Sequence, residues 1–170
     1  MTLGLFQPEK TWEAPTQFPR LWDYNGPIAF DVETHDPHLT TRGPSWAWGD
    51  GRVVGMGLAW DSGEIYIPLA HRDGGNVASE SGGFRYIYDV LRNHKGPKLC
   101  FNGEYDFGWS RFMGWTFSGE IVDVARAIPL LDTNRYSYSL DDVAADYLGV
   151  GKEEELLVEA AKAQGYDHKN

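Results

Sequence analysis

Two carboxylates alternate along one short apolar segment, Ile28–Thr34. Side chains of a strand point alternately to its two faces, so Asp31 and Glu33 share one face and their apolar neighbours point into a core. Neighbouring carboxylates repel each other unless a positive charge lies between them. Oxygen ligands of this kind are preferred by hard divalent cations such as Mg²⁺ or Mn²⁺. The segment therefore predicts a metal site at the end of a strand.

A third carboxylate follows a second apolar run, Leu99–Phe101. Asn102 and Gly103 interrupt this run, and Asp106 then lies where a helix is expected to begin. Because it follows a strand end, Asp106 could complete the metal site formed by Asp31 and Glu33.

Both segments resemble motifs of the DEDD superfamily of 3′–5′ exonucleases, which is named for its four acidic residues. The resemblance is greatest to the proofreading domain of family A DNA polymerases, particularly those of phages. Asp31-Val32-Glu33-Thr34 is similar to the first exonuclease motif, Asp-x-Glu. Asn102–Asp106 is similar to the second, Asn-x-x-x-Asp, with a tyrosine before the acid.

Two further segments extend this resemblance to about residues 27–152. Ile65–His71 resembles the strand that lies between the two motifs. Tyr138–Ala144, followed by Tyr147–Gly149, resembles the Ser-Leu…Tyr-Leu-Gly element downstream of them. The resemblance implies an α/β protein with the ribonuclease H-like fold, a mixed central sheet with helices on both faces.

The resemblance also implies roles for individual residues in a two-metal hydrolysis of phosphodiester bonds. Asp31 would bridge both metals, Glu33 would bind one and orient water, and Asp106 would support the second. Asn102 and Tyr105 would contact or position the terminal nucleotide, although core packing is the alternative for Tyr105. Thr34 would reach the terminal sugar or base.

The fourth acid of the family, expected after the Leu-Gly element in Tyr-x-x-x-Asp or His-x-x-x-x-Asp, has no clear counterpart. Tyr138–Asp142 fits the first pattern formally, but we interpret Asp142 as part of a helix start. We therefore expect the domain to be incomplete at its C-terminal end and its second metal to bind weakly. The chain could be a piece of a longer protein, another chain could supply the acid, or the site could be inactive.

The composition is that of a single acidic domain. The chain has 170 residues, a net charge of −10 and one cysteine, Cys100, which lies in an apolar strand pattern and should be buried. No segment is apolar enough to span a membrane, and no secretion signal is present. These features predict a cytoplasmic protein, in the host bacterium if a phage encodes it. An acidic surface binds nucleic acid poorly, so a polymerase domain or subunit should supply most of the DNA affinity.

Periodicity and capping signals give the expected elements. Residues 1–26 form an arm that packs through Phe6, Trp12, Phe18 and Trp22, and residues 27–170 form the exonuclease domain. The expected strands are 27–33, 52–60, 64–69, 98–101 and 120–122. The expected helices are 84–93, 105–113, one from a cap at Asp123 to 131, 140–148 after a cap at Ser139, and 152–164. Residues 35–51 and 71–83 are expected to be loops.

Three functions fit these observations. The first is a metal-dependent 3′–5′ exonuclease on single-stranded DNA 3′ ends, proofreading for a DNA polymerase. The second is an inactive module of the same fold that binds DNA or a polymerase. The third is an RNA-trimming exonuclease. In addition, His71 could face a substrate cleft or serve its own loop, and Arg72 could meet a phosphate although Asp73 beside it weakens that case.

Overall fold

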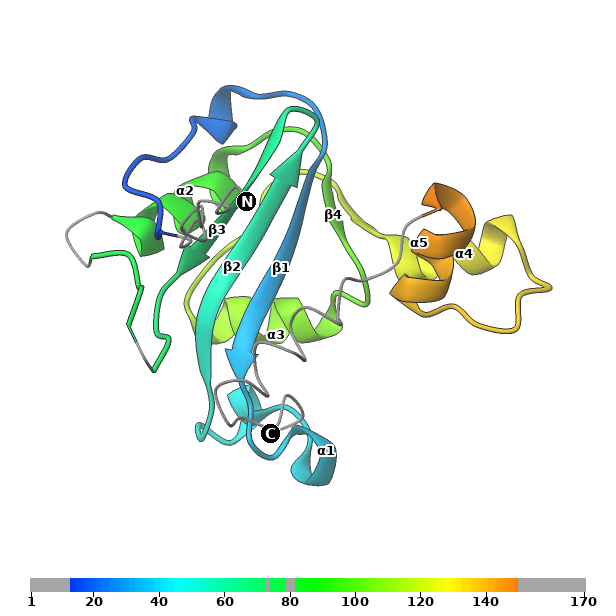
Figure 1. The fold of residues 1–170 in the computed structure, drawn as a ribbon, viewed down its shortest axis with the longest axis horizontal. Coiled ribbons are helices and arrows are strands. Elements are labelled where there is room, and N and C mark those ends of the chain that lie inside the picture. Colours follow the sequence, from blue (N-terminus) through cyan, green and yellow to red (C-terminus); the bar gives the residue numbers. More distant parts are fainter. Residues whose placement is uncertain (1–12, 73, 79–81, 150–170) are drawn as a thin grey trace, which may run out of the picture.

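The computed structural model describes residues 13–72, 74–78 and 82–149, which are built around one five-stranded sheet of order β3-β2-β1-β4-β5 (Figure 1). The strands are β1 (Ile28–His35), β2 (Arg52–Trp60), β3 (Gly63–Pro68), β4 (Lys98–Cys100) and β5 (Ile121–Asp123). The β1–β2 and β2–β3 pairs are antiparallel, and the β1–β4 and β4–β5 pairs are parallel. The predicted mixed sheet is confirmed.

Five α-helices connect and cover these strands. They are α1 (Leu39–Arg42), α2 (Gly83–Asn93), α3 (Glu104–Phe112), α4 (Val124–Leu131) and α5 (Leu140–Leu148). Two 3₁₀ turns, η1 (Leu21–Asp23) and η2 (Ser45–Ala47), complete the described elements. The prediction of a loop over 35–51 was wrong in part, because α1 and η2 lie within it. The helix predicted at 152–164 lies outside the described residues.

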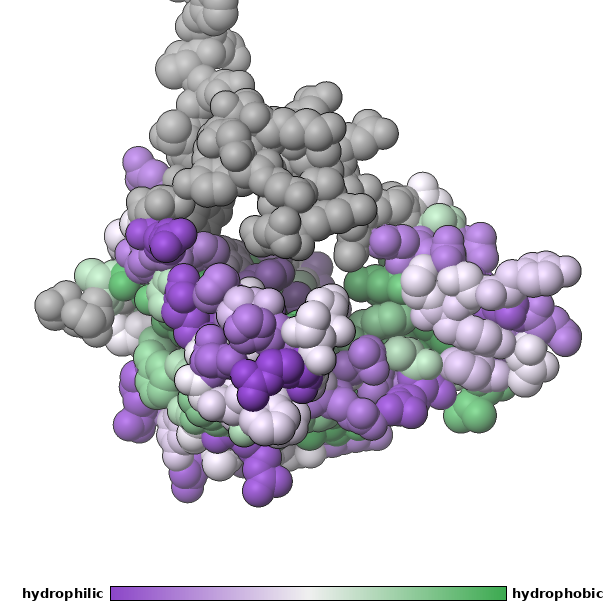
Figure 2. All heavy atoms as spheres, turned by 90° about the horizontal axis from the view of Figure 1, so that it is seen from below, coloured by the Kyte–Doolittle hydropathy of each residue, from purple (hydrophilic) through white to green (hydrophobic). Residues whose placement is uncertain are grey.

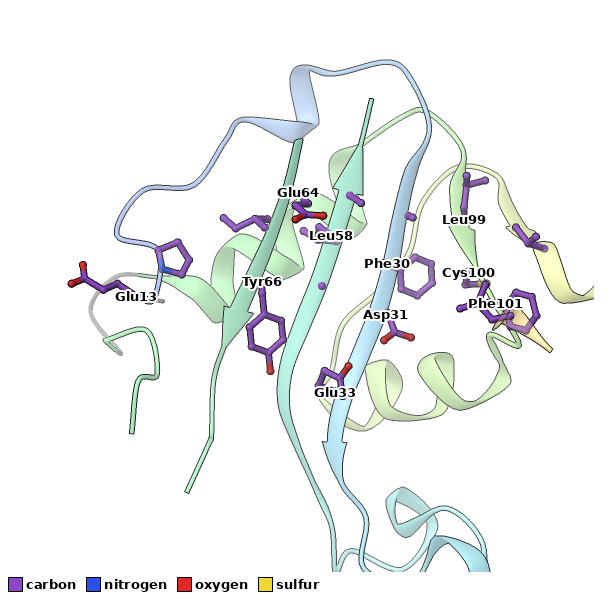
Figure 3. A pocket seen from close by; sticks show the side chains of 17 residues that line it. Glu13, Phe30, Asp31, Glu33, Leu58, Glu64, Tyr66, Leu99, Cys100 and Phe101 are labelled. Atoms are coloured by element: carbon purple, nitrogen blue, oxygen red, sulfur yellow. The ribbon is translucent and has the colours of Figure 1, made fainter. Parts of the chain in front are cut away.

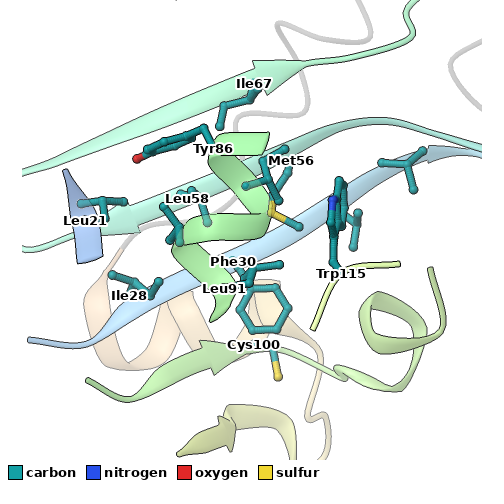
Figure 4. Close-up of a cluster of buried hydrophobic side chains, with 14 of the residues drawn as sticks. Leu21, Ile28, Phe30, Met56, Leu58, Ile67, Tyr86, Leu91, Cys100 and Trp115 are labelled. Atoms are coloured by element: carbon teal, nitrogen blue, oxygen red, sulfur yellow. The ribbon is translucent and has the colours of Figure 1, made fainter. Parts of the chain in front are cut away.

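One face of the sheet forms the hydrophobic core (Figure 4). Ile28, Phe30 and Val32 of β1 are at most 5% exposed, which is the alternation that the sequence predicts. They pack with residues of α2 and with Trp109 of α3. Cys100 is buried as expected. Helices α2 and α3 cover this face. The residues of β1 that alternate with Ile28, Phe30 and Val32 point to the opposite face.

The arm before β1 packs on α2. Phe18 stacks on Tyr86 with ring centroids 4.8 Å apart, and Trp22 meets the same ring edge-on at 6.0 Å. Phe6 and Trp12 lie outside the described residues, and the division of the chain at residue 26 stays a prediction. Among the described helices, none is long and apolar enough to cross a membrane.

Helices α4 and α5 stand beyond the β5 edge (Figure 1), and each begins at a predicted cap. The Asp123 carboxylate accepts a hydrogen bond from Ala125 N at 3.0 Å. Ser139 Oγ accepts one from Asp142 N at 3.2 Å. Gly149 ends α5 with a φ of +68°, a left-handed conformation that glycine adopts without strain. These local signals were sufficient to position both helices along the chain.

Candidate active site

Asp31 and Glu33 lie side by side on the face of β1 opposite the core. Burial along β1 alternates, and both carboxylates are exposed where their neighbours Phe30 and Val32 are buried. Both point into a groove of about 860 Å³ (Figure 3). Asp31 and Glu33 therefore share one face of β1, as the sequence predicts. The groove that they line is large enough for a nucleotide.

Gly57, Leu58 and Ala59 of β2 line the groove beside the acids. Gly57 is the cross-strand partner of Asp31, and Gly55 is the partner of Glu33. A Cβ on Gly55 would lie 2.2 Å from the hydroxyl of Tyr66, which reaches across from β3. Tyr66 thus forms the wall facing the acids, and its pKa is raised to about 12, first by burial and then by the charge of Glu33. The small residues that alternate at Gly55, Gly57 and Ala59 are a signal in the sequence for an open surface beside the acids.

Asp106 lies behind the acid pair in the first turn of α3. Strand β4 pairs with β1 only at Ile28 and Ala29, so the edge of β1 beyond them lacks a neighbouring strand. The Asp106 carboxylate takes that place and accepts a hydrogen bond from Val32 N at 3.0 Å. It is 4% exposed. Burial, followed by the charges of Asp31 and Glu33, raises the pKa of Asp106 to about 6.

Carboxylate oxygens are the ligands that hard divalent cations prefer, and the charges of Asp31 and Glu33 make ionisation of Asp106 less favourable, an effect that a cation would offset. Asp31 and Glu33 are the pair that opens into the groove. Within the described parts of the chain, no three acidic, histidine or cysteine side chains converge closely enough to hold a metal ion. Asp106 is turned toward the backbone of β1 and is the member of the predicted set that does not line the groove.

Thr34 and Tyr105, both predicted to contact substrate, contact each other. Their hydroxyls are 2.7 Å apart, and the Tyr105 hydroxyl donates to Asp36 Oδ2 at 3.0 Å. A phenol has one proton, so Thr34 must be the donor to Tyr105. Asp36 also accepts from Ser45 N at 3.0 Å, which ties the start of η2 to α3. We did not predict Asp36, because Tyr105 lies 69 residues away and no local pattern links them.

Asn102, the third predicted substrate contact, lies in a left-handed conformation with φ +58°. Asparagine tolerates this conformation better than most residues. Its side chain is exposed, and its backbone N–H donates to Asp123 Oδ1 at 2.9 Å. Gly103 N donates to Asp123 Oδ2 at 3.1 Å. Asp123 is therefore a helix cap, as predicted, and it also holds the turn that begins α3 and positions Asp106.

Replacing Asp123 with alanine should lower the free energy of unfolding by about 2–3 kcal/mol, because three backbone N–H groups lose a charged acceptor. Urea denaturation of the variant and the wild type measures the change. Asp123→Asn keeps one oxygen acceptor and should lose less. A loss for Asp123→Ala of under about 0.5 kcal/mol, the range of ordinary surface changes, would contradict this role.

Comparison with known proteins adds a relation to polymerases and nucleases. No family model matches the chain. Over 156 residues, 87% of this chain, it is 32% identical to a DNA-directed DNA polymerase of Pseudomonas phage M6, and it spans 23% of that protein's length. The NrnC protein of Brucella melitensis superposes with a TM-score of 0.58 at 17% identity, covering 80% of this chain and 59% of NrnC.

The EXO domain of Aedes aegypti Nibbler superposes with a TM-score of 0.54 at 15% identity, covering 79% of this chain and 65% of that domain. The chain resembles a DEDD-type exonuclease domain in sequence and in fold. The ribonuclease H-like fold that the two acidic motifs implied is confirmed. Asp31 and Glu33 lie on β1, the central strand of this sheet.

One formal candidate for the fourth acid of a DEDD-type exonuclease has another role. Asp142 lies in the first turn of α5, where its carboxylate accepts from Ser139 Oγ at 2.7 Å. Its pKa is lowered by the hydroxyls of Ser137 and Ser139. Asp142 does not line the groove, so its interpretation as part of a helix start agrees with the structure.

Proposed function

We propose that this chain is a metal-dependent 3′–5′ exonuclease module of a DNA polymerase, acting on single-stranded DNA 3′ ends. The observation that carries the proposal is the pair Asp31 and Glu33 on an open groove, with Asp106 hydrogen-bonded directly behind them. Similarity to a phage DNA polymerase over most of the chain supports both the substrate and the partner. Such a module would work in the cytoplasm of the host bacterium.

In this proposal the chain's own residues bind and orient. Asp31 and Glu33 would hold Mg²⁺ or Mn²⁺, with Asp106 supporting a second ion, and NrnC has been solved with bound Mg²⁺. A divalent cation offsets the charge of the phosphate and makes water a better nucleophile. Tyr66 lines the groove near Glu33 and could contact a bound nucleotide there. Thr34 at the end of β1, Asn102 in the turn before α3 and Tyr105 in α3 would position the terminal nucleotide.

Dependence on the cation is the first expected result. A single-stranded DNA labelled at its 5′ end should shorten stepwise from the 3′ end in Mg²⁺ or Mn²⁺, and EDTA should abolish the reaction until excess cation restores it. Gel analysis of the products measures both rate and direction. RNA of the same sequence, run in parallel, tests the alternative of an RNA-trimming enzyme. Shortening that persists in EDTA would contradict the metal-dependent proposal.

A non-catalytic binding module is the second candidate. It is favoured by one observation: within the described residues, Asp142, the formal match to the fourth acid of the family, does not line the groove, and its carboxylate accepts a hydrogen bond from Ser139 Oγ at the start of α5. The same assay separates the two candidates, because a binding module would hold the oligonucleotide without shortening it in either cation.

A further inference from the structure

Basic side chains lie beyond Glu33, outside the residues that line the groove. His35 is exposed and follows Asp31 and Glu33 in the alternation of β1, so it lies on the same face. Its cross-strand partner is Arg52, the exposed first residue of β2. Arg52 Nε donates to Ala70 O at 3.2 Å, which places the residues after β3 beside it. We call His35, Arg52, His71 and Arg72 the basic rim.

A β-bulge is the reason that His35 and Arg52 meet on this face. The β1–β2 register pairs Glu33 with Gly55 but Thr34 with Val53, so one residue of β2 is extra. Without that extra residue Arg52 would lie on the core face, since a one-residue shift turns every following side chain over. The bulge buries Val53, which is 2% exposed, and turns Arg52 toward solvent beside the acids.

The arginines of the described residues differ in whether a nearby carboxylate pairs with them. Five arginines pair with nearby carboxylates: Arg20, Arg42, Arg85, Arg126 and Arg135. Within the described residues, Arg52 and Arg72 form no ion pair. The acids nearest to β1's end are already engaged, Asp36 by Ser45 and Tyr105 and Asp50 by Arg42. Arg92 and Arg111 likewise form no ion pair among the described residues, so what distinguishes the rim is its position beyond Glu33 on the same face of the sheet.

Internal hydrogen bonds hold the rim in place. His71 Nε2 lies 2.6 Å from the Tyr66 hydroxyl, so the wall of the groove and the rim are joined. Asn76 accepts from His71 N at 2.7 Å and donates to His71 O at 2.9 Å. Figure 2 looks onto this end of the molecule and shows hydrophilic side chains gathered over it. His71 therefore serves its own loop, and it does not line the groove.

We propose that the basic rim binds backbone phosphates of a single-stranded nucleic acid whose terminal phosphodiester lies at Asp31 and Glu33. His35 lies two residues beyond Glu33, roughly 7 Å along β1, which is comparable to one step between phosphates of an extended strand. Exposed arginine and histidine recognise phosphate without reading the base. The inference rests on the proposed function and names the residues that would hold the strand beside the reacting end.

Binding of a fluorescein-labelled single-stranded oligonucleotide tests the rim without hydrolysis. The full chain carries Asp31→Asn in every sample so that the probe stays intact, and anisotropy gives the dissociation constant over a range of salt. Arg52→Gln with Arg72→Gln should weaken binding several-fold and reduce the slope of log K against log salt by about 1.4, or about 0.7 for each lost phosphate contact. Arg85→Gln, on α2 at the opposite face, is the matched control and should leave the slope unchanged.

Several outcomes would overturn the proposal: no binding by the parent protein, an unchanged slope in the double variant, or an equal fall in the Arg85→Gln control. Arg72→Gln alone guards against misfolding, because Arg72 makes no hydrogen bond among the described residues, and it should reduce the slope by about half as much. Arg52→Lys should restore most of the binding. Hydrolysis by the wild type is measured separately, so a failed rim and a failed exonuclease are distinguishable.

Discussion

Replacing Asp31 with asparagine should reduce cation-dependent DNA hydrolysis by about 10³-fold or more, because the variant loses a charge at the centre of the groove. Asp31 faces solvent on β1, so the change leaves the core untouched. It also removes one of the negative charges that raise the pKa of Asp106. The variant should therefore fold as well as the wild type or slightly better. Initial rates on labelled DNA and thermal unfolding measure the two effects.

Glu64→Gln is the matched control for this variant. Glu64 is also an exposed carboxylate on the groove, but it lies on β3 opposite Ala59, away from Asp31 and Glu33. Its loss should change the rate by only a small factor. Equal losses in Glu64→Gln and Asp31→Asn would indicate general electrostatics, and full activity in Asp31→Asn would remove the acid pair from the mechanism.

Replacing Asp106 with asparagine should stabilise the protein near pH 8 and have little effect near pH 4. The folded-state pKa of Asp106 is about 6, above its ordinary value of 3.8, so the folded state favours the protonated acid. That contribution to stability is complete below about pH 4 and is lost as the pH rises through 6, amounting to about 3 kcal/mol. Asparagine cannot ionise, and its amide oxygen can still accept from Val32 N.

Urea denaturation of wild type and variant at both pH values checks this expectation, and the quantity of interest is the difference between the two proteins. Asp142→Asn is a control of opposite sign. The pKa of Asp142 is lowered by its serine partners, so its ionised form stabilises the fold and the variant should lose stability toward neutral pH. The difference in the free energy of unfolding between the wild type and Asp106→Asn could be the same at pH 4 and pH 8. That result would mean that Asp106 ionises as easily in the folded chain as in the unfolded chain.

Ionisation of Asp106 is unfavourable in the folded protein, as expected for a carboxylate whose charge a bound cation would offset. A buried carboxylate beside two others is unfavourable in the folded protein. A bound divalent ion would lower that cost and so couple stability to metal. If Asp106 served only to accept the hydrogen bond from Val32 N, asparagine would serve as well. The variant Asp106→Asn therefore separates this structural role from the role of the charge in binding a cation.

Local patterns in the sequence were enough for the elements and for the acid pair. The strand over 52–60 and the helix starts at Asp123 and Ser139 were predicted at the positions observed, since alternation and capping depend on neighbouring residues. For the same reason Asp31 and Glu33 could be assigned to one face of β1. The two acidic motifs, taken together, also implied the fold.

Only the tertiary structure decided how these parts meet. Asp106 turns to Val32 N because β4 ends early beside β1, and Tyr105 is held by Asp36 across 69 residues of sequence. Gly57 of β2 lines the groove opposite Asp31, and a bulge turns Arg52 to the same face of the sheet. Each of these features depends on register between strands or on contacts between distant segments, and such information is absent from any local stretch of the chain.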